Sequence, residues 1–199
     1  MRKSSPAESE WAELRESQSE TLKVPGTALA VLIDLGEAID LHPRNKADVG
    51  ERLAYLVLSR QYGKNLGVVS GPVYESMTVE GAEVRSRFRN AASGLRAKPL
   101  PPVYELSTLL GRTARLVRNS PNSELPGFQI CGEDHHWVWA DARIEGQTMV
   151  VDSSQIAKPI AVRYGWADNP TVNLVNEAGL PAAPFRTDSF AALTANRHF

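Results

Sequence analysis

The sequence predicts a mixed fold, α/β in its first third and all-β in the remainder. Two helical patterns flank one long apolar run within residues 1–66. From 67 to 199, short apolar runs are separated by turn residues, which is typical of an antiparallel β-sandwich. The sequence therefore predicts two domains, 1–66 and 67–199. The second contains an excursion at about 91–126 that is rich in Pro, Ser and Arg.

The first helix is predicted from residue 9 to about residue 22. One side of it carries positions that recur at helical spacing, and charged residues occupy the rest of its surface. The recurring positions are Trp11, Leu14, Gln18 and Leu22. The pair Pro25-Gly26 then ends the helix.

The apolar run at 27–35 does not alternate polar and apolar residues, which predicts a strand buried on both faces. A second helix is predicted from near Asn45 to near Tyr62-Gly63, with Asp48 in its first turn. Its predicted apolar face consists of Val49, Leu53, Leu56 and Val57. A lone buried strand has no sheet of its own. The helix–strand–helix unit is therefore expected to pair with strands from elsewhere.

The second domain is predicted to begin with a half-exposed strand. Arg85, Arg87 and Arg89 form its solvated face, and alternate with inward Val84, Ser86 and Phe88. Further strands are predicted at 128–131, 137–140, 142–144, 148–151 and 160–164, with a hairpin turn at Gly146. A short helical turn is expected at 106–110. The tail at 179–186 is predicted to be an irregular strap across the domain surface.

Composition limits the classes of partner. Of the 199 residues, 42% are hydrophobic and 23% charged, as in ordinary globular proteins, and the net charge is −1. Neither a nucleic-acid nor a membrane partner is therefore expected. Residues 7–23 fit neither a signal peptide nor a membrane span. The single cysteine, Cys131, excludes an intrachain disulfide. No metal or cofactor is expected, and the compartment stays open.

The loop at 34–46 is the candidate functional centre. His42 lies there among acidic residues, after the predicted strand. Sites in open parallel sheets form outside the carboxyl ends of the strands, and such a loop can present a general base. The alternative is that His42 caps the following helix or fills a structural turn.

Several spaced segments resemble the C-terminal part of the sialate O-acetylesterases, which are SGNH-type carbohydrate esterases. These segments are 33–36, 40–46, 49–53, 159–167, 179–181 and 184–188, together with Trp11, Arg15 and Gln18. The resemblance implies an enzyme in which an early Ser attacks an acetyl ester on a sugar. The family's Gly-Gln-Ser-Asn and Gly-Glu-Ser-Asn motifs do not occur in this sequence. The chain thus resembles a portion whose nucleophile is supplied by an upstream chain or domain.

The resemblance also implies that Asp40 orients His42 through Nδ1, as the third member of a triad does. The general SGNH pattern places this Asp three residues before the His, where this sequence has Ile39. A backbone carbonyl could orient His42 instead, and Asp34 and Glu37 are weaker stand-ins. The alternative from another class is a non-catalytic β-sandwich accessory or glycan-binding module.

Three other groups of residues invite functional interpretations. His135-His136 beside Glu133 and Asp134 suggests a metal site, but adjacent histidines on a strand point to opposite faces, which favours a solvated turn. Cys131 follows an apolar run and is predicted to be a buried small side chain. The third group consists of three tryptophans, which could form a sugar-stacking platform, although core packing is commoner for such residues. Its members are Trp137, Trp139 and Trp166.

Overall fold

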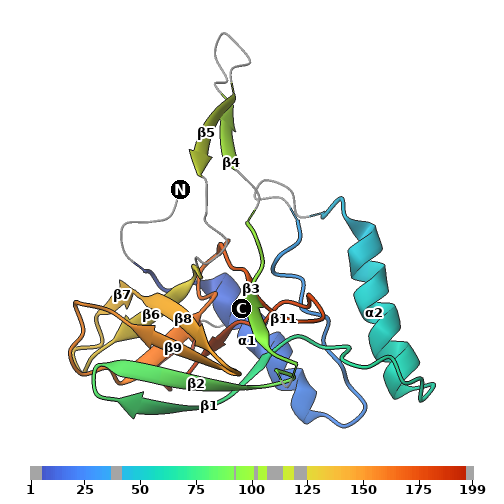
Figure 1. Cartoon of the computed structure of the whole chain (residues 1–199), viewed down its shortest axis with the longest axis horizontal. Helices are drawn as coiled ribbons and strands as arrows, with labels where there is room; N and C mark the ends of the chain where they lie inside the picture. Colours follow the sequence, from blue (N-terminus) through green and yellow to red (C-terminus); the bar gives the residue numbers. More distant parts are fainter. Residues whose placement is uncertain are drawn as a thin grey trace.

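The computed structural model describes residues 6–36, 42–91, 93–100 and 125–195, and the backbone of two further strands within 103–118. In this part of the chain, two helices precede every strand (Figure 1). They are α1 (Glu10–Glu20), which continues into the 3₁₀ turn η1 (Thr21–Lys23), and α2 (Lys46–Arg60). Within the described ranges, neither helix has the length and apolarity needed to cross a bilayer.

Side-chain caps fix where both helices begin. The Ser9 hydroxyl accepts a hydrogen bond from the Ala12 amide at 3.1 Å, and Asn45 Oδ1 accepts one from the Asp48 amide at 3.1 Å. Such caps satisfy backbone donors that have no partner within the helix. Both predicted helices are therefore confirmed, with their starts at the expected residues.

The structure has no strand at 27–35, and the expected pairing of this segment with strands from elsewhere stays a prediction. Residues 27–32 have no regular secondary structure, and a turn follows at Ile33. Arginine side chains of α2 satisfy carbonyls of this segment: Arg60 Nη1 donates to Thr27 O and Arg52 Nη1 donates to Val31 O, both at 2.7 Å. A strand needs a neighbouring strand for its backbone groups, and none of the described strands pairs with this segment. The two helices of the predicted helix–strand–helix unit are therefore present, and the segment between them has no partner among the described strands.

Two four-stranded antiparallel sheets make up most of the remaining fold, with the orders β1-β2-β9-β8 and β12-β10-β6-β7. The first contains β1 (Val73–Glu80), β2 (Glu83–Arg89), β8 (Asp141–Glu145) and β9 (Thr148–Asp152). The second contains β6 (Phe128–Cys131), β7 (Trp137–Trp139), β10 (Ala161–Tyr164) and β12 (Phe185–Arg186).

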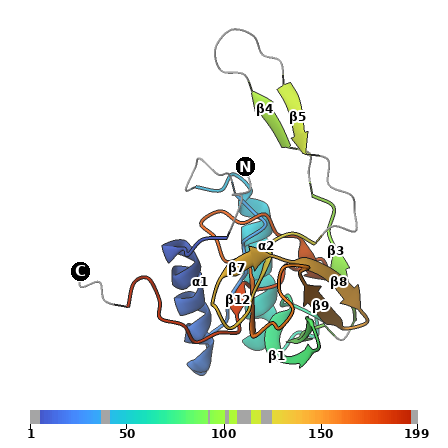
Figure 2. The same ribbon diagram turned by 90° about the vertical axis from the view of Figure 1, so that its left-hand side faces the viewer.

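Two smaller antiparallel pairs complete the described strands. β3 (Leu95–Ala97) pairs with β11 (Leu174–Asn176), and β4 (Val103–Leu106) pairs with β5 (Ala114–Arg118). The β4–β5 hairpin extends away from the body of the molecule in both views (Figures 1 and 2). The helical turn predicted at 106–110 falls partly outside the described residues, and its first residue belongs to β4.

Local sequence signals correctly predict the central strands. Val84, Ser86 and Phe88 of β2 are buried, while Arg85 lies on the wetter face and pairs with Glu80 and Glu145. Gly146, at φ +62°, occupies the hairpin turn between β8 and β9. A β-rich fold of antiparallel sheets is thus confirmed.

The hydrophobic core lies between the two large sheets. Val84, Met149 and Val151 of the first sheet join Phe128 and other buried residues of the second in one cluster. Sandwiches pack in this way because each sheet buries one apolar face.

The sequence predicts the tail at 179–186 to be a strap across the domain surface, but the structure buries several of its residues. Ala182 is completely buried, and Phe185 stacks on Tyr74 with ring centroids 4.7 Å apart. A Cβ on Gly71 would lie 1.9 Å from the Pro181 carbonyl oxygen, so only glycine fits where the tail crosses this segment. The tail is therefore part of the core.

Helix α1 is fastened to the second sheet by ion pairs. Arg163 of β10 binds Glu8 at 2.7 Å and Asp188 at 2.8 Å, and Arg186 of β12 binds Glu16 at 2.7 Å. Arg15 adds hydrogen bonds to backbone carbonyls, including that of Ala167. The first helix thus packs on the β-sandwich.

Candidate active-site loop

The structure describes both ends of the loop at 34–46 but not its middle. Asp40, together with 37–41, lies outside the described residues, so the predicted Asp40–His42 pairing stays a prediction. Gly36 has φ +97°, and a Cβ on it would lie 3.7 Å from Cβ of Pro43. The two ends of the loop therefore meet. His42 is exposed beside this junction, three residues before the Asn45 cap of α2.

A buried ion pair anchors the start of the loop. Arg52 of α2 donates to both carboxylate oxygens of Asp34, at 2.6 and 2.8 Å, and the two side chains are only 10% and 9% exposed. The same guanidinium donates to Val31 O, and Lys98 Nζ lies 3.5 Å from Asp34. Bidentate arginine–carboxylate pairs are geometrically specific. The pair therefore sets where α2 and the loop lie relative to each other.

The charge state of Asp34 follows from these contacts. Burial opposes its ionisation, but hydrogen bonding and charge from Arg52, with a smaller contribution from Lys98, outweigh burial, so the pKa of Asp34 is lower than usual. Both carboxylate oxygens already accept from Arg52. Asp34 therefore acts as an anchor in this structure.

A small pocket of about 80 Å³ lies beside this anchor. Asp34 and Lys98 line it together with residues of β11 and the tail, among them Asn173, Leu174 and Pro181. Asn173 donates to the Lys98 carbonyl at 2.9 Å and so holds the segment after β3. Sequence reasoning assigned no role to Arg52 or Lys98, because contacts between distant segments bring them to Asp34.

His135 and His136 lie in a turn, as predicted. The His135 amide donates to Gly132 O, and the His136 amide to Asp134 Oδ1, both at 3.0 Å. The His135 ring stacks on Phe190 at 4.0 Å between centroids. No cluster of three candidate metal ligands occurs among the residues that the structure describes.

The remaining candidates are divided between core and surface. Cys131 is fully buried, and burial, followed by the charge of Asp188, raises its pKa to about 11, which does not suit a nucleophile. Trp166 is 1% exposed and belongs to the core. The Arg163 guanidinium lies 4.1 Å from the ring centre of Trp137 and 4.9 Å from that of Trp166. Trp137 and Trp139 are half-buried on the edge strand β7.

Comparison with known proteins gives one informative similarity. No family model matches the chain, and no curated protein matches it. Among solved structures, the crystal structure of a carbohydrate acetylesterase from Xanthomonas citri matches with a TM-score of 0.76 and 39% sequence identity. The match covers 90% of this chain but only 36% of the other. The chain is thus similar, in fold and in sequence, to part of a carbohydrate esterase.

Proposed function

We propose that this chain is the His-bearing C-terminal portion of a carbohydrate O-acetylesterase of the sialate type, which hydrolyses acetyl esters on sugars. The observation that carries this proposal is the 39% identity to a carbohydrate acetylesterase over 90% of the chain. The substrate class is an acetylated carbohydrate.

In this mechanism His42 is the general base and then the general acid. It takes the proton of a Ser hydroxyl as the Ser oxygen attacks the acetyl carbonyl, and returns that proton to the sugar oxygen as the ester bond breaks. Water, deprotonated by His42, then releases acetate and regenerates the Ser. Asp40 would orient the imidazole and stabilise its charged form.

The position of His42 supports this role. It lies exposed at the junction of Gly36 with Pro43, and both sides of the loop are fixed, by the Asp34–Arg52 pair before it and by the Asn45 cap after it. A base must be held within hydrogen-bond reach of the hydroxyl that it activates. A loop fixed at both ends can present His42 to a second unit with little loss of entropy.

The Ser nucleophile is proposed to come from an upstream chain or domain. A His without a nucleophile or an oxyanion hole cannot carry out acyl transfer. The chain alone is therefore expected to turn over p-nitrophenyl acetate no faster than buffer. Turnover by the pure chain that His42→Ala abolishes would contradict the need for a second unit.

The test of the proposal is a complete enzyme in which this chain replaces the matching part of the Xanthomonas citri acetylesterase. His42→Ala should reduce kcat by about 10³-fold or more, as loss of a triad His does. His136→Ala, in an exposed turn, is the matched control and should leave kcat unchanged. Full activity of the His42→Ala enzyme would refute the assignment.

A glycan-binding module is the second candidate function. The two half-buried tryptophans of edge strand β7, Trp137 and Trp139, favour it because sugars stack on such rings. Binding of an acetylated glycan by the isolated chain that is lost in Trp139→Ala but kept in His42→Ala would support this alternative.

A further inference from the structure

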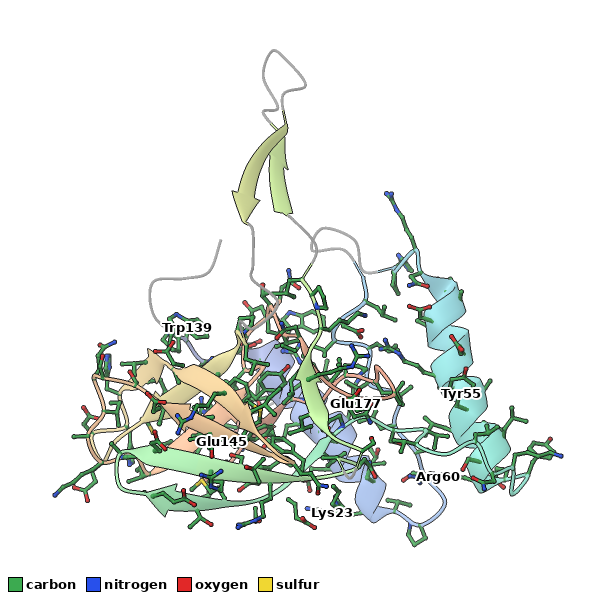
Figure 3. The ribbon with its side chains drawn as sticks, in the orientation of Figure 1. Lys23, Tyr55, Arg60, Trp139, Glu145 and Glu177 are labelled. Carbon is green, nitrogen blue, oxygen red and sulfur yellow. The ribbon has the colours of Figure 1, made fainter. Side chains whose placement is uncertain are left out.

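Within the part of the chain that the structure describes, helix α2 is covered on one side only. Arg52 and Leu56 face the body and are 8% and 5% exposed, whereas Leu53, Val57 and Leu58 are 50%, 48% and 38% exposed. Of the four residues predicted to form its apolar face, the structure buries only Leu56. Figure 3 shows side chains of α2 projecting away from the sheets.

The exposed residues form one continuous face. At 3.6 residues per turn, they share one arc of the helix, opposite Arg52 and Leu56. We call this arc the outer face of α2; its members are Ala47, Gly50, Leu53, Ala54, Val57 and Leu58. The charged residue on this arc is Lys46 in the first turn, and the rest of the arc is uncharged, although the exposed arc of a surface helix is usually polar.

Gly50 is a second sign that the outer face meets another element. A Cβ on Gly50 would find no heavy atom within 4 Å, so nothing in the described structure requires glycine there. A glycine inside a helix costs about 1 kcal/mol relative to alanine. The distance between a helix and its neighbour depends on the side chains at the contact, and small residues such as Gly50 and Ala54 allow close approach.

We infer that the outer face of α2 is the docking surface for the unit that carries the Ser nucleophile. The inference rests on the proposed function and names where its second unit binds. Almost two thirds of the Xanthomonas citri chain lies outside the match, so a large body is available to cover this face. The outer face also begins directly after the His42 loop, at the Asn45 cap.

This position favours the Ser-bearing unit over a second copy of the chain. An element docked on α2 is held next to His42, where acyl transfer needs the Ser hydroxyl. A second copy could also bury Leu53 and Val57, but its sequence contains neither Gly-Gln-Ser-Asn nor Gly-Glu-Ser-Asn. Only the Ser-bearing unit would both cover the outer face and complete the site.

Cysteine accessibility tests the inference without using activity. Leu53→Cys is placed in the isolated chain and in the chimeric enzyme described above, and alkylation of residue 53 by iodoacetamide is followed by peptide mass spectrometry. The matched control is Val79→Cys on β1, because Val79 is 46% exposed and Leu53 50%. The buried Cys131 should give little background.

Residue 53 should be alkylated rapidly in the isolated chain. In the chimera its alkylation rate should be at least about tenfold lower, because burial protects the thiol. Residue 79 should react at the same rate in both. Equal rates at residue 53 would overturn the inference. Slow alkylation in the isolated chain, together with a dimer mass by light scattering, would assign the face to a second copy and would also overturn it.

Two further readouts keep the inference separable from the proposed function. Amide exchange of residues 46–60 in the unsubstituted proteins measures the same protection if Leu53→Cys impairs folding. A chimera that protects α2 but lacks esterase activity would refute the function and retain the docking surface. An active, His42-dependent chimera with α2 unprotected would refute the docking surface alone.

Discussion

Replacing Asp34 by Asn tests whether the buried ion pair holds the His42 loop in place. The Arg52 side chain, 10% exposed, would lose its charged partner while staying inside the protein. Breaking a buried pair by removing one member costs about 3–5 kcal/mol. Asn still offers one carbonyl oxygen, and Arg52 keeps its 2.7 Å bond to Val31 O. We therefore expect the lower end of that range, about 3 kcal/mol.

Urea unfolding followed by tryptophan fluorescence measures this loss. The midpoint should fall with little change in m, and the melting temperature should fall by about 6–12 °C for a chain of this size. The matched control is Glu20→Gln, which removes the exposed Lys23–Glu20 pair, with side chains 76% and 55% exposed, and should change neither measurement.

The double variant Asp34→Asn/Arg52→Met checks the cause. Removing the unpaired charge should recover part of the loss, because buried pairs replaced by apolar groups often lose little stability. An Asp34→Asn chain within about 0.5 kcal/mol of wild type would refute the reasoning, since that is the range of unremarkable surface substitutions. So would a double variant whose cost equals the sum of the two single costs.

Further predictions concern pH, reactivity and packing. The pKa of Asp34 is lower in the folded than in the unfolded chain, so ionised Asp34 stabilises the fold above the unfolded pKa of about 3.9. This stabilisation is lost as the pH falls from there through the folded pKa. Urea midpoints should therefore decline less at acid pH in Asp34→Asn than in wild type. Cys131 should resist a thiol reagent at pH 8 until guanidinium unfolds the chain, and prompt reaction of the native protein would contradict its burial. Phe185→Ala should cost about 3–5 kcal/mol in urea unfolding, whereas a cost near zero would place the tail outside the core. Gly50→Ala should stabilise the isolated chain by about 1 kcal/mol, and Gly71→Ala should destabilise it; melting curves that order the two the other way would contradict the geometry at both positions.

Elements with strong local signals were predictable from the sequence. The Asn45 cap marks the start of α2, alternation identifies β2, and Gly146 marks the β8–β9 hairpin. Each of these signals comes from residues within a few positions of one another. The short strands β3 and β11, which pair with each other, were missed because runs such as Leu95–Ala97 carry little periodicity.

The absence of a strand at 27–35 in this structure has a different cause. An apolar run of this length is compatible both with a buried strand and with an extended segment packed against a helix. The deciding factor is the partner of the backbone carbonyls, which in this structure are the side chains of Arg52 and Arg60. The same limitation affects the candidate site. Residue type and position identified His42, but the role of Arg52 depends on how α2 folds back on Asp34.

The arginine at the centre of β10 has a consequence for how this domain can sit in a longer polypeptide. Glu8, near one end of the described chain, and Asp188, near the other, both bind the Arg163 guanidinium, at 2.7 and 2.8 Å. Glu8 and Asp188, near the two ends of the described chain, therefore lie close to each other in space. Domains with neighbouring ends tolerate insertion and circular permutation. A host protein could thus carry this domain as an insert between two positions close in space, without stretching its own fold.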